Sequence, residues 1–256
     1  MATEKFLDIH GGQVFVRIWE KNNNLIPVIM LHDSLGCVET WRDFPEKLSQ
    51  HLNRTVIAYD RLGFGQSSER IAPPSYGFIE EESKIIAKIT QALEINEYIL
   101  FGYSVGGAMS LIAAKNNPQC KAVISESAQV FVEEQTKAGI VNAIAFYQDP
   151  VKFDKLKKYH GEKTTWVFKA WTDTWLAPEF ANWSLLSHLP DVLCPVLVIH
   201  GDKDEYGSLA FPDGIATTVA GNSKKVILHN CGHIPHREHE TEVLSEVKSF
   251  LDQTCP

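Results

Sequence analysis

One serine in this sequence has neighbours that suit it to nucleophilic chemistry. Ser104 stands in the pattern G-Y-S-V-G (residues 102–106), after the apolar run 98–101 and before the helix-compatible run 108–115. A serine in a tight turn between a strand and a helix projects its hydroxyl out of the sheet, and flanking glycines let neighbouring backbone pass without a Cβ clash. The N–H groups that open the helix would point at the same spot and stabilise an oxyanion. The competing interpretation is a glycine-rich turn that contains a serine by chance.

A serine hydroxyl is a weak nucleophile at neutral pH, so this chemistry also needs a base within hydrogen-bond reach and a group that orients the base. Two later strand ends carry such groups, namely the acidic turn 202–205 and then His233. Reactive side chains in a parallel sheet gather just past the carboxyl ends of its strands. The order serine, acid, histidine therefore predicts a Ser-acid-His site, with Asp202, Asp204 and Glu205 as candidates for the acid.

These residues meet only if the chain builds one sheet with its strand ends aligned. Short apolar runs alternate with amphipathic runs, which indicates a parallel sheet covered by helices on both faces. Strands are predicted at 27–31, 55–59, 98–101, 121–125, 195–200 and 225–229, and helices at 39–52, 80–93, 108–115 and 240–251. A partly alternating stretch at 6–19, broken at Gly11-Gly12, indicates a β-hairpin. The predicted fold class is α/β with a mostly parallel central sheet.

The segment 131–190 breaks this rhythm. Strand patterns vanish there and the residues read as helices rich in aromatic side chains, which predicts a helical cap inserted after the sixth strand. The remaining residues, 1–130 and 191–256, would form the core domain. Trp171 and Trp175 lie one helical turn apart on the same stripe. That stripe packs the cap onto the sheet domain or lines an apolar substrate pocket, and the two roles are compatible.

Four motifs at strand ends stand in the order and spacing of one known family. They are His32 to Gly36, Asp60 to Ser67, Gly102 to Gly106, and the pair Gly201-Asp204 and Gly232-His233. Across residues 6–252 the chain resembles the α/β-hydrolase fold superfamily, and within it a capped serine esterase or lipase-like hydrolase. The resemblance implies an α/β-hydrolase fold whose central sheet is flanked by helices and accompanied by a small helical cap.

The resemblance also implies a role for each residue that matches a motif. Ser104 would be the nucleophile, and His233 the general base and then the general acid. Asp204 is the fourth residue of the family's motif at that strand end, so it would hold the histidine tautomer and stabilise the imidazolium. The backbone N–H groups of Val105 and Ser34 would form the oxyanion hole.

One position departs from the family. Members usually have glycine after the histidine of the first motif, whereas this chain has Asp33. Its side chain would narrow the site or pair with a neighbour such as Arg61, and its N–H is the alternative to Ser34 as oxyanion donor. His32 resembles a structural loop histidine of this fold, and Asp60 and Arg61 resemble residues that anchor their loop against the sheet.

Other residues near the last strand have plainer interpretations. His236 and His239 follow His233 at spacings that suggest metal ligands. No carboxylate or cysteine stands at a matching distance, so no metal site is predicted. Cys231 is expected to be a packed thiol at a strand end.

The resulting hypothesis is a serine hydrolase that cleaves carboxylic esters through an acyl-enzyme, without a cofactor. Tyr103, Trp171 and Trp175 are predicted to bind a small to medium, apolar or aromatic acyl group, while Tyr206 and Glu126 border the pocket or lie outside it. The same catalytic residues would serve a carbon–carbon bond hydrolase, a lactonase, a thioesterase or a perhydrolase. A ligand-binding receptor with vestigial catalysis is a further alternative. A dehalogenase is disfavoured, because that branch needs a carboxylate in place of the serine.

Composition argues against several other classes of protein. The 256 residues carry a net charge of −8 spread along the chain, which disfavours a nucleic-acid partner. No apolar stretch approaches the roughly 18 residues of a membrane helix, and the first residues lack the layout of a signal peptide. Five widely spaced cysteines without a C-x-x-C pair favour free thiols in a reducing compartment. The expected location is the cytoplasm, and the expected partners are a small-molecule substrate and water.

Overall fold

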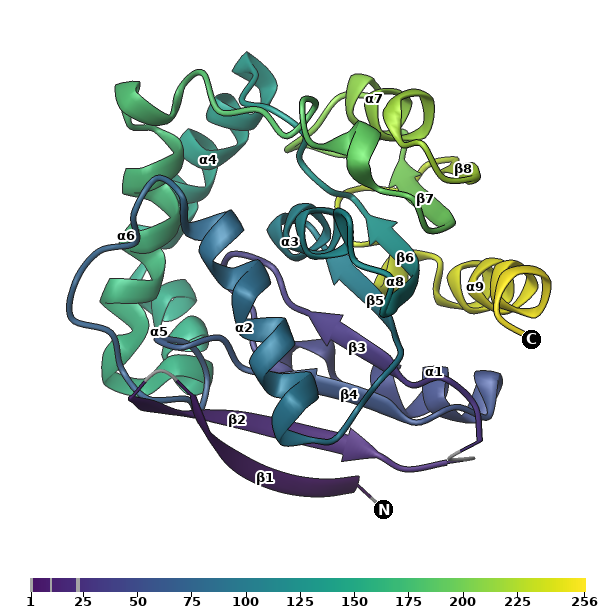
Figure 1. Ribbon diagram of the computed structural model, residues 1–256. Helices are drawn as coiled ribbons and strands as arrows, with labels where there is room; N and C mark the ends of the chain where they lie inside the picture. Colours follow the sequence, from purple (N-terminus) through teal and green to yellow (C-terminus); the bar gives the residue numbers. More distant parts are fainter. Residues whose placement is uncertain (1, 10, 22–23) are drawn as a thin grey trace.

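The computed structural model describes residues 2–9, 11–21 and 24–256 of the chain (Figure 1). In this part of the chain eight strands form one sheet, in the spatial order β1-β2-β4-β3-β5-β6-β7-β8. The strands are β1 (Ala2–Ile9), β2 (Gly12–Trp19), β3 (Val28–Leu31), β4 (Val56–Tyr59), β5 (Tyr98–Tyr103), β6 (Cys120–Glu126), β7 (Val196–Gly201) and β8 (Ser223–Leu228).

Strand direction follows from the connections between strands. β1 and β2 form the hairpin expected around Gly11-Gly12 and pair antiparallel, and β2 also pairs antiparallel with β4. From β4 to β8 every neighbouring pair is parallel, because long crossovers link these strands. β3, β4, β5 and β7 are buried along their whole length, which explains their continuous apolar runs. The prediction of an α/β fold with a mostly parallel sheet is confirmed.

Helices cover both faces of this sheet. α2 (Phe78–Ala92), α3 (Val105–Ala114) and α7 (Ala210–Thr218) contribute to one buried apolar cluster. α1 (Phe44–Leu52) and α9 (Glu240–Thr254) contribute to a second cluster. Successive residues of β3 alternate between the two clusters, as the pleat of a strand requires. The sheet is therefore the shared wall of two cores, and its strand ends are rigid attachment points.

One predicted helix is wrong in its extent. Residues 39–52 do not form a single helix, because the 3-10 turn η1 (Val38–Trp41) is separated from α1 by Arg42, whose φ is 56°. Pro45 lies in the first turn of α1. Proline lacks an N–H and is tolerated in that turn but not further inside a helix, so α1 begins just before it. α7 and the short α8 (Pro235–Glu238) lie outside every predicted helix.

Helices also fill the predicted cap segment, residues 131–190. α4 (Glu134–Tyr147), α5 (Pro150–His160), η2 (Gly161–Lys163), α6 (Thr164–Trp175), η3 (Pro178–Phe180) and η4 (Leu189–Asp191) lie between β6 and β7 in the sequence. In Figure 1, α4, α5 and α6 stand together in green at one side of the sheet. The ring of His160 accepts the N–H of Gly65 (3.0 Å) and donates to the carbonyl of Leu35 (2.9 Å). These bonds hold the helical segment against the loops that follow β3 and β4.

Two features bear on the expectations from composition. All five cysteines are free thiols, and Cys231 is fully buried in the second apolar cluster, as expected for a packed thiol. Among the helices of the described residues, none combines the length and the apolar character needed to cross a bilayer.

Candidate active site

Ser104 lies at the apex of the turn between β5 and α3. Its φ of 56° and ψ of −126° fall in a region that residues other than glycine rarely adopt. Its N–H donates to the carbonyl of Glu126 (2.8 Å), which fixes the turn against β6. A Cβ on Gly106 would lie 2.2 Å from the carbonyl oxygen of Leu31, and a Cβ on Gly102 would lie 2.2 Å from that of Gly106. Both glycines are therefore required by the close approach of backbone, not by the turn alone.

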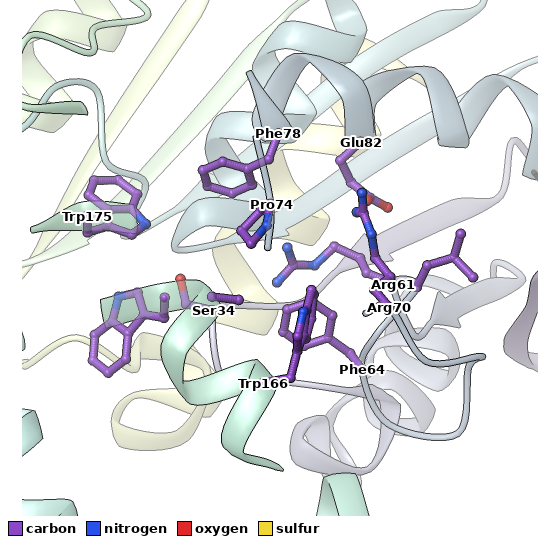
Figure 2. Close-up of a pocket in the computed structure, with 12 residues that line it drawn as sticks. Ser34, Arg61, Phe64, Arg70, Pro74, Phe78, Glu82, Trp166 and Trp175 are labelled. Carbon is purple, nitrogen blue, oxygen red and sulfur yellow. The ribbon is translucent and has the colours of Figure 1, made fainter. Parts of the chain in front are cut away.

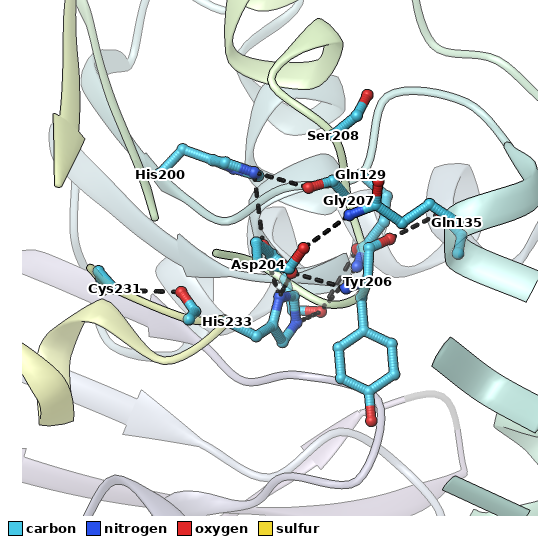
Figure 3. Close-up of polar contacts among 12 residues, drawn as sticks. Gln129, Gln135, His200, Asp204, Tyr206, Gly207, Ser208, Cys231 and His233 are labelled. Carbon is cyan, nitrogen blue, oxygen red and sulfur yellow. Dashed lines mark hydrogen bonds and ion pairs between the residues drawn. The ribbon is translucent and has the colours of Figure 1, made fainter. Parts of the chain in front are cut away.

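His233 links Ser104 to Asp204 (Figure 3). Its Nε2 lies 3.0 Å from Ser104 Oγ, and its Nδ1 lies 2.8 Å from both carboxylate oxygens of Asp204. Because a carboxylate only accepts, Nδ1 carries the proton and Nε2 is left as the acceptor for the serine hydroxyl. All three side chains are buried. The structure thus brings together the serine, the histidine and one of the three candidate acids.

The other two candidate acids lie elsewhere. Asp202 contacts the exposed His229, with 2.6 Å between its Oδ2 and the ring Nδ1. Glu205 lines the cavity beside the site, and the described hydrogen bonds of His233 go to Asp204 and Ser104 instead. Asp204 occupies the acid position because of the path of the turn after β7. This turn runs back over the sheet edge, so Asp204, two residues after Asp202, faces the residues that follow β8.

Three further groups hold Asp204 in place. The N–H of Tyr206 donates to its Oδ1 (2.8 Å), and Gln135 from α4 donates to its carbonyl (2.7 Å). His200, the penultimate residue of β7, lies 3.5 Å from its Oδ2 and also contacts the carbonyl of Gly207 (3.1 Å). Figure 3 shows these contacts converging on Asp204. Sequence reasoning did not find the role of His200, since nothing local distinguishes it from any other strand residue.

The buried hydrogen bond between His233 and Asp204 shifts the pKa of both groups. Burial works to lower the pKa of His233, but the attraction of Asp204 and the bond to it outweigh burial, so that pKa lies above its ordinary value. Burial works to raise the pKa of Asp204, and the attraction of His233 outweighs it, so that pKa lies below its ordinary value. Both shifts favour an imidazolium beside a carboxylate, the pair that would exist after His233 takes a proton from the serine.

Gln129 is a neighbour of the serine that sequence reasoning missed. Its side-chain amide is buried, with Nε2 3.2 Å and Oε1 3.3 Å from Ser104 Oγ. With Nε2 as donor to Oγ, the serine hydroxyl keeps its own proton for His233. Gln129 lies three residues beyond β6, which neighbours β5 in the sheet. The sequence does not give the order of strands in the sheet, so it could not predict that Gln129 lies beside Ser104.

A cavity of about 360 Å³ opens in front of the serine. Its size lies in the range of small-molecule sites. The three residues predicted to bind substrate all line it, together with Ser104 and His233. About half of the other lining side chains are apolar or aromatic, namely Leu35, Ile140, Tyr147, Leu156, Tyr159, Tyr206 and Ile234, and the charged ones are Asp33, Arg42, Glu205 and Arg237. Of the two residues left undecided by the sequence, Tyr206 lines the cavity and Glu126 does not.

The two residues predicted to supply oxyanion donors lie beside the serine and on the cavity. Val105 is the first residue of α3, so its N–H has no acceptor within the helix. Ser34 lines the cavity from the loop after β3. The side chain of Asp33 folds back on this loop, where its Oδ2 accepts the N–H of Leu35 (3.2 Å). Arg61 contacts Asp33 through the carbonyl oxygen (2.7 Å), not through the carboxylate.

His32 and His236 have structural partners. His32 contacts the carbonyl of Asp33 through Nδ1 (2.8 Å) and accepts the N–H of Arg61 through Nε2 (3.1 Å), and burial holds its pKa well below the ordinary value. His236 is buried against Glu126, with 2.7 Å between Nδ1 and Oε2. Within the described residues, no group of three or more histidine, cysteine or acidic side chains could hold a metal ion.

Comparisons with known proteins point to one fold family. The family model for the alpha/beta hydrolase fold matches residues 26–156, just over half of the chain. The human protein named serine hydrolase BPHL is 29% identical over 232 residues, which cover 88% of this chain and 78% of that protein. The proline iminopeptidase of Heyndrickxia coagulans is 23% identical over 296 residues, which cover 98% of this chain and 99% of that enzyme.

Solved structures extend the likeness to the whole fold. The crystal structure of proline iminopeptidase from Mycobacterium smegmatis matches with a TM-score of 0.80 at 19% identity, over 98% of both chains. At this level of identity the match concerns the fold and not the substrate.

Proposed function

The chain belongs to the α/β-hydrolase fold family and is a hydrolase, and from that premise we propose that it cleaves carboxylic esters through an acyl-enzyme on Ser104. One observation carries the proposal. His233 lies between Ser104 Oγ at 3.0 Å and the Asp204 carboxylate at 2.8 Å, so a proton acceptor and its orienting group are already aligned with the hydroxyl.

Acylation would proceed as follows. His233 Nε2 takes the hydroxyl proton while Ser104 Oγ bonds to the carbonyl carbon of the ester. The carbonyl oxygen gains the negative charge and accepts hydrogen bonds from the N–H groups of Val105 and Ser34. When the tetrahedral intermediate collapses, the bond to the alcohol oxygen breaks and His233 gives its proton to the leaving alcohol. A water molecule then repeats the cycle on the acyl-enzyme and releases the acid.

The electrostatics of the site support this sequence of proton transfers. The attraction of Asp204 raises the pKa of His233, although burial opposes it, so the imidazolium formed in the first step is stabilised. Gln129 would steady the serine hydroxyl through its side-chain amide. The Tyr206 N–H and the nearby His200 hold Asp204 in the orientation that the histidine needs.

The cavity suggests the class of substrate. Its apolar and aromatic lining, including Tyr103, Trp171 and Trp175, fits a small to medium acyl group, aliphatic or aromatic. The same catalytic residues would also serve a thioester, a lactone or a carbon–carbon bond. Relatives named proline iminopeptidases make amide cleavage at an amino-terminal proline the alternative that deserves a direct assay.

Pre-steady-state hydrolysis of p-nitrophenyl esters of graded acyl length tests the proposal. We expect a burst of p-nitrophenol equal to the enzyme concentration, followed by slower turnover, and no burst with Ser104→Ala. Equal rates for the two proteins would refute the nucleophilic role of Ser104. Proline p-nitroanilide and a short-chain thioester belong in the same screen, and a higher kcat/KM on either would replace the ester assignment while retaining the mechanism.

A further inference from the structure

A second, much smaller pocket adjoins the cavity in front of the serine (Figure 2). Ser34, Trp171 and Trp175 line both spaces. In Figure 2, Ser34 and Trp175 lie at one end of the small pocket, and Arg61, Arg70 and Glu82 lie at the opposite end. Phe64, Trp166, Pro74 and Phe78 form the apolar walls between these ends. The pocket therefore leads from the proposed oxyanion donor to a pair of guanidinium groups.

Arg61 is the unusual member of this lining. It is 4% exposed, and its Nε is buried without a hydrogen-bond partner. Its Nη2 donates to the carbonyl of Asp33 (2.7 Å), and its guanidinium lies 4.1 Å from the centre of the Phe64 ring. A guanidinium has five N–H donors, and in the described part of the chain one of them bonds to the protein while Nε is closed off without a partner. Burying a cation with unfilled donors costs several kcal/mol, and this cost calls for an explanation.

Among the described residues, no carboxylate pairs directly with the charge of Arg61. Within the described part of the chain, neither Arg61 nor Arg70 forms an ion pair with an acidic side chain. Glu82 is the acid of the pocket, and its Oε1 accepts the hydroxyl of Tyr59 (3.2 Å). Burial raises the pKa of Glu82, although the attraction of Arg61 opposes that shift. Two guanidiniums and one carboxyl leave the far end of the pocket positive.

The size of the pocket limits what it can hold. Its volume is about 30 Å³. A space of about 10–15 Å³ on this measure holds one water molecule, so the pocket admits roughly two oxygen-sized atoms. That is room for the two oxygen atoms of a carboxylate, whose planar geometry also matches the fork of a guanidinium.

We propose that this pocket is a carboxylate subsite, and that the preferred substrates are acyl compounds bearing a second, remote carboxylate that Arg61 binds. This inference rests on the proposed hydrolase function and adds the charge of its substrate. Apolar walls strengthen the attraction, because little water screens a charge held between Phe64, Trp166 and Phe78. The guanidinium N–H groups that Asp33 does not bond then donate to the substrate carboxylate.

Two sets of matched substrates test the subsite and locate the carboxylate. Monomethyl succinate, glutarate and adipate are compared with methyl butyrate, valerate and hexanoate, which places the charge on the acyl side. 4-Acetoxybenzoate is compared with methyl 4-acetoxybenzoate, which places it on the leaving group. In at least one comparison the wild-type protein should favour the anionic ester in kcat/KM. Arg61→Met should lower that preference about tenfold to a hundredfold, chiefly through KM, the range for a hydrogen bond to a charged group.

Arg54→Met is the matched control. Arg54 is also 4% exposed and also donates to backbone carbonyls, those of Ile26 and Cys255, but it precedes β4 whereas Arg61 follows it. This variant should keep the wild-type preference even if it is less stable. Arg61→Lys keeps the charge without the fork and should retain part of the preference. The preference is a ratio within one protein, so a loss of folded fraction does not alter it.

A direct titration separates this proposal from the hydrolase function. Glutarate added to the wild-type protein should shift amide resonances around the pocket in NMR spectra, and Arg61→Met should weaken that binding at least tenfold. If no ester is cleaved but glutarate binds through Arg61, the ester assignment fails and the subsite stands. No preference for either anionic series, or an equal preference in wild type and Arg61→Met, overturns the subsite.

Discussion

Two buried histidine–carboxylate pairs lie three residues apart in this chain and differ in one respect that matters. His233 contacts Asp204 at 2.8 Å, and His236 contacts Glu126 at 2.7 Å, both through Nδ1. The ring of Tyr103 touches both histidines, at 5.3 Å and 4.9 Å between ring centres. The two pairs are thus alike in burial, in partner and even in neighbour.

The two pairs differ in the surroundings of the second ring nitrogen, Nε2. His233 directs Nε2 at the hydroxyl of Ser104 and lines the cavity. The ring of His236 is packed against Trp41 (4.8 Å) and Phe44 (5.2 Å) and does not line the cavity in front of the serine. A buried imidazole–carboxylate pair is therefore not a functional signature by itself. Access to a nucleophile and to space for substrate separates a proposed catalytic pair from a structural one.

The largest expected effect compares the two histidines as matched substitutions. His233→Gln should lower kcat for a p-nitrophenyl ester about a millionfold, the scale on which removal of a triad histidine acts. His236→Gln should lower it less than tenfold, because this ring touches no reacting atom. Steady-state kinetics on samples shown to be folded by circular dichroism measure both. A loss for His236→Gln comparable to that for His233→Gln would break the distinction drawn here.

The two carboxylates offer the second comparison. Asp204→Asn should lower kcat about ten-thousandfold, because an amide favours the wrong tautomer of His233. Glu126→Gln changes the same atoms in the neighbouring pair and should leave kcat within about tenfold of wild type, since only its backbone carbonyl touches the serine turn. Comparable rates for the two variants would show that Asp204 does not orient the base.

The pair of His236 and Glu126 should matter for the stability of the protein more than for its activity. His236→Leu leaves the fully buried Glu126 without its partner, and the other oxygen of that carboxylate already lacks one. We expect the free energy of unfolding in urea to fall by about 3–5 kcal/mol, the usual cost of breaking a buried pair. The double variant His236→Leu/Glu126→Leu should recover most of this loss, because no uncompensated polar group remains. A double variant as unstable as the single one would show that packing, not the pair, is responsible.

The pH dependence of kcat/KM should report on His233 and not on His236. The base must be neutral to accept a proton, so activity should fall about tenfold per pH unit below the pKa of His233. That pKa is raised by Asp204 against the opposing effect of burial, which places the acid limb above the ordinary imidazole value of about 6.5. In Asp204→Asn the limb of the residual activity should move to lower pH. An unmoved limb would assign the titration to another group.

The smallest effect concerns the serine's second neighbour. Gln129→Leu removes the amide that lies 3.2 Å from Ser104 Oγ and should lower kcat about twofold to tenfold, the worth of one neutral hydrogen bond. KM for a neutral ester should change little, and Gln129→Glu should be tested beside it, because a carboxylate cannot donate to Oγ. A change confined to KM would make Gln129 a substrate contact instead.

Features that depend on residues close together in the sequence could be predicted from it. The glycines around Ser104 marked the turn, because only glycine admits backbone at 2.2 Å from where a Cβ would stand. The alternation of apolar runs with amphipathic ones predicted the parallel sheet and its two helical layers. The break in that rhythm at 131–190 located the helices α4 to α6. The single helix predicted across 39–52 was wrong, because the chain breaks at Arg42. The prediction followed the hydrophobic spacing and gave too little weight to Pro45.

Contacts between segments far apart in the sequence could not be predicted from local sequence patterns. The approach of Gln129 to Ser104 depends on β6 lying beside β5, and the support of Asp204 by His200 depends on how the turn after β7 folds back. The isolation of the Arg61 guanidinium depends on the aromatic walls that α6 and α2 bring to the loop after β4.

The sequence by itself determined the fold class, the turn that exposes a serine, and the order of the groups that surround it. These follow from periodicity and from backbone sterics, which act between residues close in the chain. Tertiary structure alone decided which groups hold Asp204 in place, which of two similar histidine pairs opens on the cavity in front of the serine, and where a buried cation is left unpaired. Each of these depends on distances between segments that the chain brings together only when the sheet is complete.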